Sequence, residues 1–86
     1  MPTISTFYGM LIQMFWNDHA PPHFRCIYGE FEALIDIRKK EVMEGKLPRR
    51  ALNLVLDWTD LHQAELLEDW ELCRAKQYPK PIAPLE

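Results

Sequence analysis

The sequence has few glycines, few cysteines and no long apolar run. Only three of its 86 residues are glycine, and they do not form the glycine-rich loop that cradles phosphate groups. The longest apolar stretches are a few residues, whereas a membrane-spanning helix needs about 20. The two cysteines, Cys26 and Cys73, have no metal-ligand spacing. We expect two reduced, buried thiols, with a disulfide or a reactive thiol as the alternatives, and no place in a membrane.

The first residues of the chain and its net charge indicate where the protein is located and which partners it disfavours. The segment 1–5 has no basic region and no cleavage-type site, so we expect no signal peptide and a cytoplasmic location. A net charge of −3 argues against strong non-specific binding of nucleic acid. Six basic residues lie between Arg38 and Arg50, whereas six acids and no Lys or Arg lie between Asp57 and Glu71. The molecule should therefore be electrically polarised.

The length and the order of the patterns predict one α+β domain. We expect strands and a hairpin in residues 1–37, a basic connector at 38–47, two helices in 48–76 and an extended tail at 77–86. The predicted architecture is a small antiparallel sheet of three to four strands, packed against the two C-terminal helices.

Alternating residues predict the strands. Residues 10–16 place Met10, Ile12, Met14 and Trp16 on one face at period two. The next two alternating runs, 23–28 and 31–37, are separated only by Gly29-Glu30, which is typical of a tight hairpin.

The hairpin turn also predicts a register. With Tyr28 opposite Phe31, His23 faces Asp36 across the two strands, and a slip by one residue would bury acids. One face is then apolar and forms the predicted core: Phe24, Cys26, Tyr28, Phe31, Ala33, Ile35 and Ile37.

The second half has helical periodicity. Pro48 suits a first helical turn, and apolar residues then recur at three and four positions as far as residue 61. A second apolar stripe runs from Leu66 to Cys73. Asp60 and Gln63 have capping-box spacing, which predicts a bend near residues 61–63. Three prolines keep the C-terminal tail extended, as an arm or an edge strand.

Two helices can cover only one face of this sheet. The other face has apolar residues of its own, Leu11, Phe15, Ile27 and Leu34. A contiguous patch of this kind usually contacts something. Either the tail or the N-terminal Phe7-Tyr8 folds over it, or it binds a second copy or a partner protein.

The loop from residue 17 to residue 23 is the best candidate for chemistry. It brings Asp18, His19 and His23 beside two prolines, and functional residues are common on rigid loops. If the Asp36 carboxylate accepts a hydrogen bond from the His23 ring, it fixes the tautomer of the ring and raises the basicity of the ring, as in general bases. The catalytic candidates are therefore His19, His23 and Asp36. A plain surface hydrogen bond and an Asx turn at Asp18 are the structural alternatives.

The binding candidates are Asn17, Asp18, Arg25, Arg49 and Arg50. Arg25 lies diagonal to two acids in the predicted register, and the basic segment flanks the start of the first helix, where backbone donors favour anions. Phosphate or RNA binding there is the alternative to a solvated charged face. Because a metal site needs three or four ligands in a closed geometry and no recognised spacing occurs, we expect no metal and no cofactor.

Several segments resemble a bacterial family of short proteins, the domain of unknown function 4160. The resemblance extends over essentially the whole chain. It rests on segments 1–5, 17–24, 28–29, 33–37, 45–51, 61–62, 65–67 and 84–85, and on the single residues Gly9, Trp58, Trp70 and Ile82. The loop of that family usually continues to a further histidine after Phe24, where this chain has Arg25, and this departure weakens the case for a metal. Members are often encoded beside another small protein, which implies a two-protein, toxin–antitoxin-like module.

Two functional hypotheses follow. In the first, the chain is a protein-interaction module that binds a partner or a second copy. In the second, it binds or cleaves RNA, with His23 oriented by Asp36 as the base, His19 as the acid, and Arg25, Arg49 and Arg50 on the phosphate.

Overall fold

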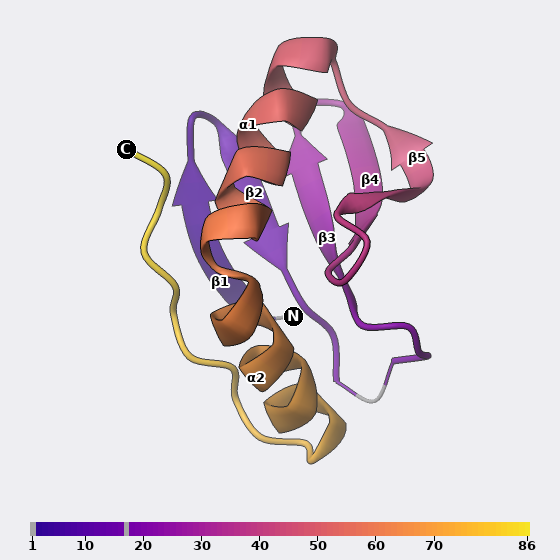
Figure 1. The fold of residues 1–86 in the computed structure, drawn as a ribbon, viewed down its shortest axis with the longest axis vertical. Coiled ribbons are helices and arrows are strands. Elements are labelled where there is room, and N and C mark those ends of the chain that lie inside the picture. The colour runs from indigo at the N-terminus through magenta and orange to yellow at the C-terminus, as the bar shows by residue number, and fades with distance from the viewer. Residues whose placement is uncertain (1, 17) are drawn as a thin grey trace.

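The computed structural model describes residues 2–16 and 18–86, which form a sheet layer and a helical layer (Figure 1). Helices α1 (Arg49–Leu61) and α2 (Gln63–Arg74) lie on one face of the sheet. The α+β class is confirmed, but the sheet has five strands instead of three to four. They are antiparallel and follow the chain order: β1 (Thr3–Phe7), β2 (Met10–Gln13), β3 (His23–Tyr28), β4 (Phe31–Asp36) and β5 (Glu41–Lys46).

The β3–β4 hairpin has the predicted register. Tyr28 pairs with Phe31, and His23 pairs with Asp36 at the far end. Gly29 occupies the turn with φ +56°, a conformation that glycine adopts without steric cost. The predicted core face of this hairpin is therefore confirmed.

The two outer strands are irregular. β1 lies in the segment 1–37 where strands were predicted, but its position was not, and β5 was not predicted at all. In β1 the register shifts between Thr3 and Ser5, so that Ile4 and Ser5 are both buried and the alternation is broken. The segment 38–47, predicted to be a basic connector, contains β5, an edge strand whose residues are almost all exposed. A polar edge strand has no buried face to reveal it in the sequence.

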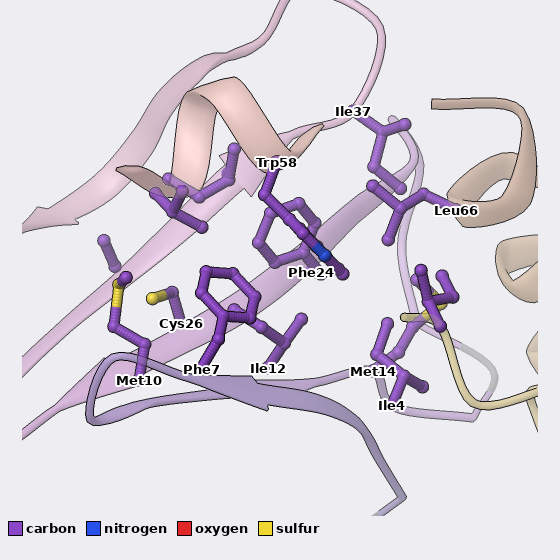
Figure 2. Packing of buried hydrophobic residues seen from close by; sticks show 14 of the residues in the cluster. Ile4, Phe7, Met10, Ile12, Met14, Phe24, Cys26, Ile37, Trp58 and Leu66 are labelled. Carbon is purple, nitrogen blue, oxygen red and sulfur yellow. The ribbon is translucent and has the colours of Figure 1, made fainter. Parts of the chain in front are cut away.

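The core lies between the sheet and the helices, and Trp58 of α1 is at its centre (Figure 2). The Trp58 ring is 5.1 Å from the ring of Phe7 and 5.8 Å from that of Phe24, measured between centroids. Leu66 brings α2 into the same cluster. Trp16, expected on the core face of β2, is 43% exposed because the strand ends before it, at Gln13.

The bend between the helices is at His62, as predicted, but the predicted capping box is not formed. Asp60 accepts a hydrogen bond of 2.7 Å from the Lys40 side chain, and Gln63 donates to the carbonyl oxygen of Ile37. The His62 ring instead contacts the Glu65 carboxylate at 2.7 Å.

The C-terminal tail is extended and runs along β1. The Ile82 amide donates to the carbonyl oxygen of Ile4, and the Trp58 indole donates to that of Ala83, both at 2.8 Å. Because Ile82 is buried in the core cluster, the tail belongs to the helix side of the sheet. The hypothesis that it covers the opposite face is wrong.

Cys26 and Cys73 are free and buried, as expected. Burial raises the pKa of the Cys26 thiol to about 12 and that of the Cys73 thiol to about 11. Neither of the helices that the structure describes has the length and apolar character of a membrane span.

Candidate functional site

The loop between β2 and β3 contacts α2 at one end and the C-terminal tail at the other. The ring of His23 lies 5.1 Å from that of Trp70 on α2, and the ring of Trp16 lies 5.2 Å from that of Tyr78 in the tail. Asn17, one of the binding candidates, lies outside the described residues. His19 is exposed, and its backbone amide donates to Asp18.

His23 is held by a carboxylate, but not by the predicted one. Its Nε2 lies 3.0 Å from Oδ2 of Asp18, and its Nδ1 lies 2.8 Å from the carbonyl oxygen of Pro21. Both partners are acceptors, so the ring can donate to both only when it carries two protons. The residue is 7% exposed. A substrate would have to displace one of these contacts to reach either nitrogen.

Asp36 lies opposite His23 in the strand register, but its side chain binds the turn between β4 and β5 instead. Its Oδ1 accepts hydrogen bonds of 2.9 Å from the backbone amides of Arg38 and Lys39. The carboxylate thereby ends β4 and shapes the turn to β5, as Asx residues commonly do. The predicted His23–Asp36 dyad is therefore replaced by a His23–Asp18 pair and a separate Asp36 turn.

Arg25 is on the sheet face that points away from the helices. Its guanidinium lies 3.1 Å from the Glu32 carboxylate, one of the two partners that the register allowed. The same group lies 4.6 Å from the centroid of the Phe15 ring, in a cation–π arrangement. This side chain therefore lies on the face of the sheet opposite the helices.

Within residues 2–16 and 18–86, no three His, Cys, Asp or Glu side chains are grouped as metal ligands would be. His23 and Asp18 contact one another, while Asp36 faces its own turn. The contact between His23 and Asp18 therefore fixes the loop to the start of β3, and these three side chains do not form the closed ligand set of a metal centre.

A family model described as "Domain of unknown function (DUF4160)" matches residues 9–71, which is most of the chain. The chain belongs to the DUF4160 family. No curated protein and no solved structure gives a significant match. The description of the DUF4160 family assigns no activity.

This DUF4160 chain also has a pocket that the sequence did not reveal, lined by Tyr8 and by six residues of the matched part. It has a volume of about 390 Å³ and lies between the β1–β2 turn, the end of β3 and the start of α1. Arg50, a predicted binding residue, lines it, whereas Arg49 does not. The signal in the sequence was weak, because its two tyrosines, Tyr8 and Tyr28, are 20 positions apart and meet only through the sheet.

A buried carboxylate on α2 was also missed. Asp69 is 1% exposed, and its Oδ1 accepts a hydrogen bond of 2.8 Å from the Lys80 amide of the tail. Its Oδ2 is buried without a partner among the described residues. Desolvation by burial raises the pKa of Asp69 to about 6, opposed by the Lys80 hydrogen bond and assisted by Glu68 and Glu65. This DUF4160 chain thus fixes its tail with a carboxyl group whose protonated form is favoured by burial.

Proposed function

We propose that this protein is an interaction module whose outer sheet face binds a second copy of the chain. The outer face is the side of the sheet that points away from the helices, with the apolar residues Leu11, Phe15, Ile27 and Leu34. All four are half-buried, and none belongs to the core cluster or packs against it. This observation carries the proposal, because both helices and the tail lie on the other side (Figure 1).

The apolar part of the outer face extends across three central strands. Leu11 of β2 and Ile27 of β3 are direct cross-strand neighbours, so their side chains meet. Leu34 of β4 is opposite Arg25, whose guanidinium covers Phe15. A continuous aliphatic centre with polar groups around it is the usual anatomy of a protein interface.

The charges around this centre balance and favour a second copy. Arg25 pairs with Glu32 on the neighbouring strand, and Glu32 is opposite Lys46 on the next one. Glu44 lies opposite Leu34, which gives two acids and two bases. A two-fold interface places the same surface on both subunits and needs such self-complementarity. A strongly charged partner, such as nucleic acid, would meet as many like charges as opposite ones.

The edges of the sheet are poorly suited to binding a second copy of the chain. The edge of β1 is occupied by the tail, through the hydrogen bond between Ile82 and Ile4. The edge of β5 has exposed acids, an irregular register and Gly45 with φ +79°. Such features discourage strand-to-strand addition. Association should therefore use the face.

A charge placed in the outer face tests the proposal. In Leu34→Lys the new ammonium would lie between Arg25 and Glu44, where the acid offsets the base, so the fold should tolerate it while the interface should not. Leu61→Lys is the matched control, because Leu61 is 69% exposed at the end of α1 on the helical side. We expect the dimer dissociation constant, from sedimentation velocity, to rise at least about tenfold in Leu34→Lys alone. Equal effects of both variants would contradict the proposal.

A different protein on the same face, as in the toxin–antitoxin-like module that the family resemblance implies, is the competing outcome. It would appear as a monomeric wild type that gains mass only with a host protein, and it would overturn the second copy as the occupant. Acid–base cleavage of RNA has no comparable support, because both ring nitrogens of His23 are engaged.

A further inference from the structure

The pocket beside the β1–β2 turn is a second feature that neither the core nor the outer face explains. Its volume, about 390 Å³, lies within the usual range for small-molecule sites, roughly 300 to 1,000 Å³. Its lining residues come from the β1–β2 turn, β3 and the start of α1, which lie together at the end of the sheet away from the β2–β3 loop (Figure 1). The seven lining residues are Tyr8, Met10, Tyr28, Pro48, Arg50, Ala51 and Leu54.

The lining is apolar and aromatic with one charge. Met10 and Ala51 are buried and form an apolar floor. Tyr8 and Tyr28 add two aromatic rings, and Arg50 is the sole charged residue in the lining. No carboxylate lines the pocket. Among the residues that the structure describes, Arg50 makes no ion pair, so its guanidinium is available to an anion.

Tyr8 occupies its position at a conformational cost. The two residues of the β1–β2 turn have positive φ, +48° at Tyr8 and +79° at Gly9, a conformation in which Asn-Gly is the favoured pair. A tyrosine there is strained, and it is also 56% exposed. A Cβ added to Gly9 would lie 3.4 Å from the Tyr28 ring, so the Tyr28 ring lies beside the turn. Tyr8 thus lines the pocket from a strained turn, with an edge contact to the ring of Phe7 at 6.5 Å between centroids.

Arg50 is likewise placed against the preference of its helix. The first turn of α1 carries Arg49 and Arg50 and no acid, whereas helix starts favour acidic residues. Both arginines oppose that preference equally, but only Arg50 lines the pocket. The pair therefore offers an internal comparison between charge at this helix end and charge in the pocket.

We propose that this pocket binds a small organic anion with a planar apolar ring. The ring lies against Tyr8 and Tyr28 above the apolar floor, and the anionic group accepts hydrogen bonds from the Arg50 guanidinium. A carboxylate and a phosphate monoester both satisfy this chemistry, since a guanidinium binds either through two parallel hydrogen bonds. The proposal is independent of the outer face, which contributes no residue to the pocket.

The test is an amide-resolved NMR titration of the full chain with four probes: phenylacetate, phenyl phosphate, neutral benzyl alcohol and inorganic phosphate. We expect saturable shifts with one or both aromatic anions, centred on Tyr8, Tyr28 and Arg50. The tighter of the two identifies the carboxylate or the phosphate as the anionic group. Benzyl alcohol and inorganic phosphate should each bind at least about tenfold more weakly, since each lacks one half of the recognised chemistry.

Arg50→Gln should weaken the tighter aromatic anion at least about tenfold, while Arg49→Gln stays within about twofold. Both residues are exposed, and the amide spectrum itself reports whether each variant is folded. Equal loss in the two variants would mean general charge at the helix end and would overturn the proposal. So would unchanged binding in Arg50→Gln, or the absence of saturable shifts up to about 10 mM of every probe.

Discussion

The Asp18 carboxylate lies 3.0 Å from Nε2 of His23 and joins the middle of the β2–β3 loop to the first residue of β3. The His23 ring is buried against Trp70, so this contact also connects the loop to α2. A buried histidine that loses such a partner keeps the cost of desolvation without its compensation.

Asp18 and His23 should therefore be energetically coupled. A double-mutant cycle of Asp18→Ala with His23→Gln is expected to give a coupling of about 1 to 2 kcal/mol in the free energy of unfolding. The same cycle with Asp36→Ala should give less than about 0.5 kcal/mol, because Asp36 binds the amides of its own turn. Urea unfolding of the four proteins in each cycle measures both values. A larger coupling with Asp36 would restore the dyad that the sequence predicts.

The hairpin register was predictable, whereas the side-chain pairing at its end was not. A two-residue turn at Gly29 leaves one register for all six pairs of β3 and β4, and this is a local property of the sequence. His23 is the first residue of β3, so its ring takes its partners from the loop before it. The position of that loop depends on Trp70, which is 47 residues away, and no periodicity encodes such a contact.

The edge strands β1 and β5 could not be located from the sequence for a related reason. Strand prediction depends on alternation between a buried and an exposed face. In β1 the irregular register buries Ile4 and Ser5 side by side, and in β5 nearly every residue is exposed. The outer face was predicted from the sequence because three of its four apolar residues, Leu11, Ile27 and Leu34, lie on the alternating central strands.

Asp69 predicts a specific pH dependence of stability. Its pKa is raised to about 6, so the folded state binds a proton that the unfolded state releases near pH 4. Stability from this group is therefore present at low pH and is lost as the pH rises from about 4 to about 6. The Asp69→Asn variant should not show this loss. Relative to the wild type, its free energy of unfolding should therefore increase by about 1 to 3 kcal/mol between pH 4 and 7.

Thermal and urea unfolding across this pH range would measure the difference. Glu71→Gln is the matched control on the same helix, because Glu71 is exposed, pairs with the Arg74 side chain and is not among the causes of the Asp69 pKa shift. Its profile should follow that of the wild type. An Asp69→Asn profile parallel to the wild type would show that the buried carboxylate does not control this window.

Tyr8→Asn should stabilise the protein. Asparagine tolerates positive φ better than tyrosine, and Asn-Gly is the preferred pair for this kind of turn. The expected gain is about 0.5 to 1 kcal/mol in the free energy of unfolding, measured by urea denaturation. A loss of stability would show that the contact between Tyr8 and Phe7, at 6.5 Å between ring centroids, outweighs the strain. The strain argument for the pocket would then fail.

The central claim is that the outer face binds a second copy, and intermolecular NOEs test it most directly. The sample is an equimolar mixture of ¹³C-labelled and unlabelled chain at about 1 mM, well above a micromolar dissociation constant. The account predicts cross-subunit NOEs among the side chains of Leu11, Ile27 and Leu34, and none at Leu61 on the helical side. Cross-subunit NOEs confined to the helical side, or a chain that remains at 10.2 kDa without any, would contradict it.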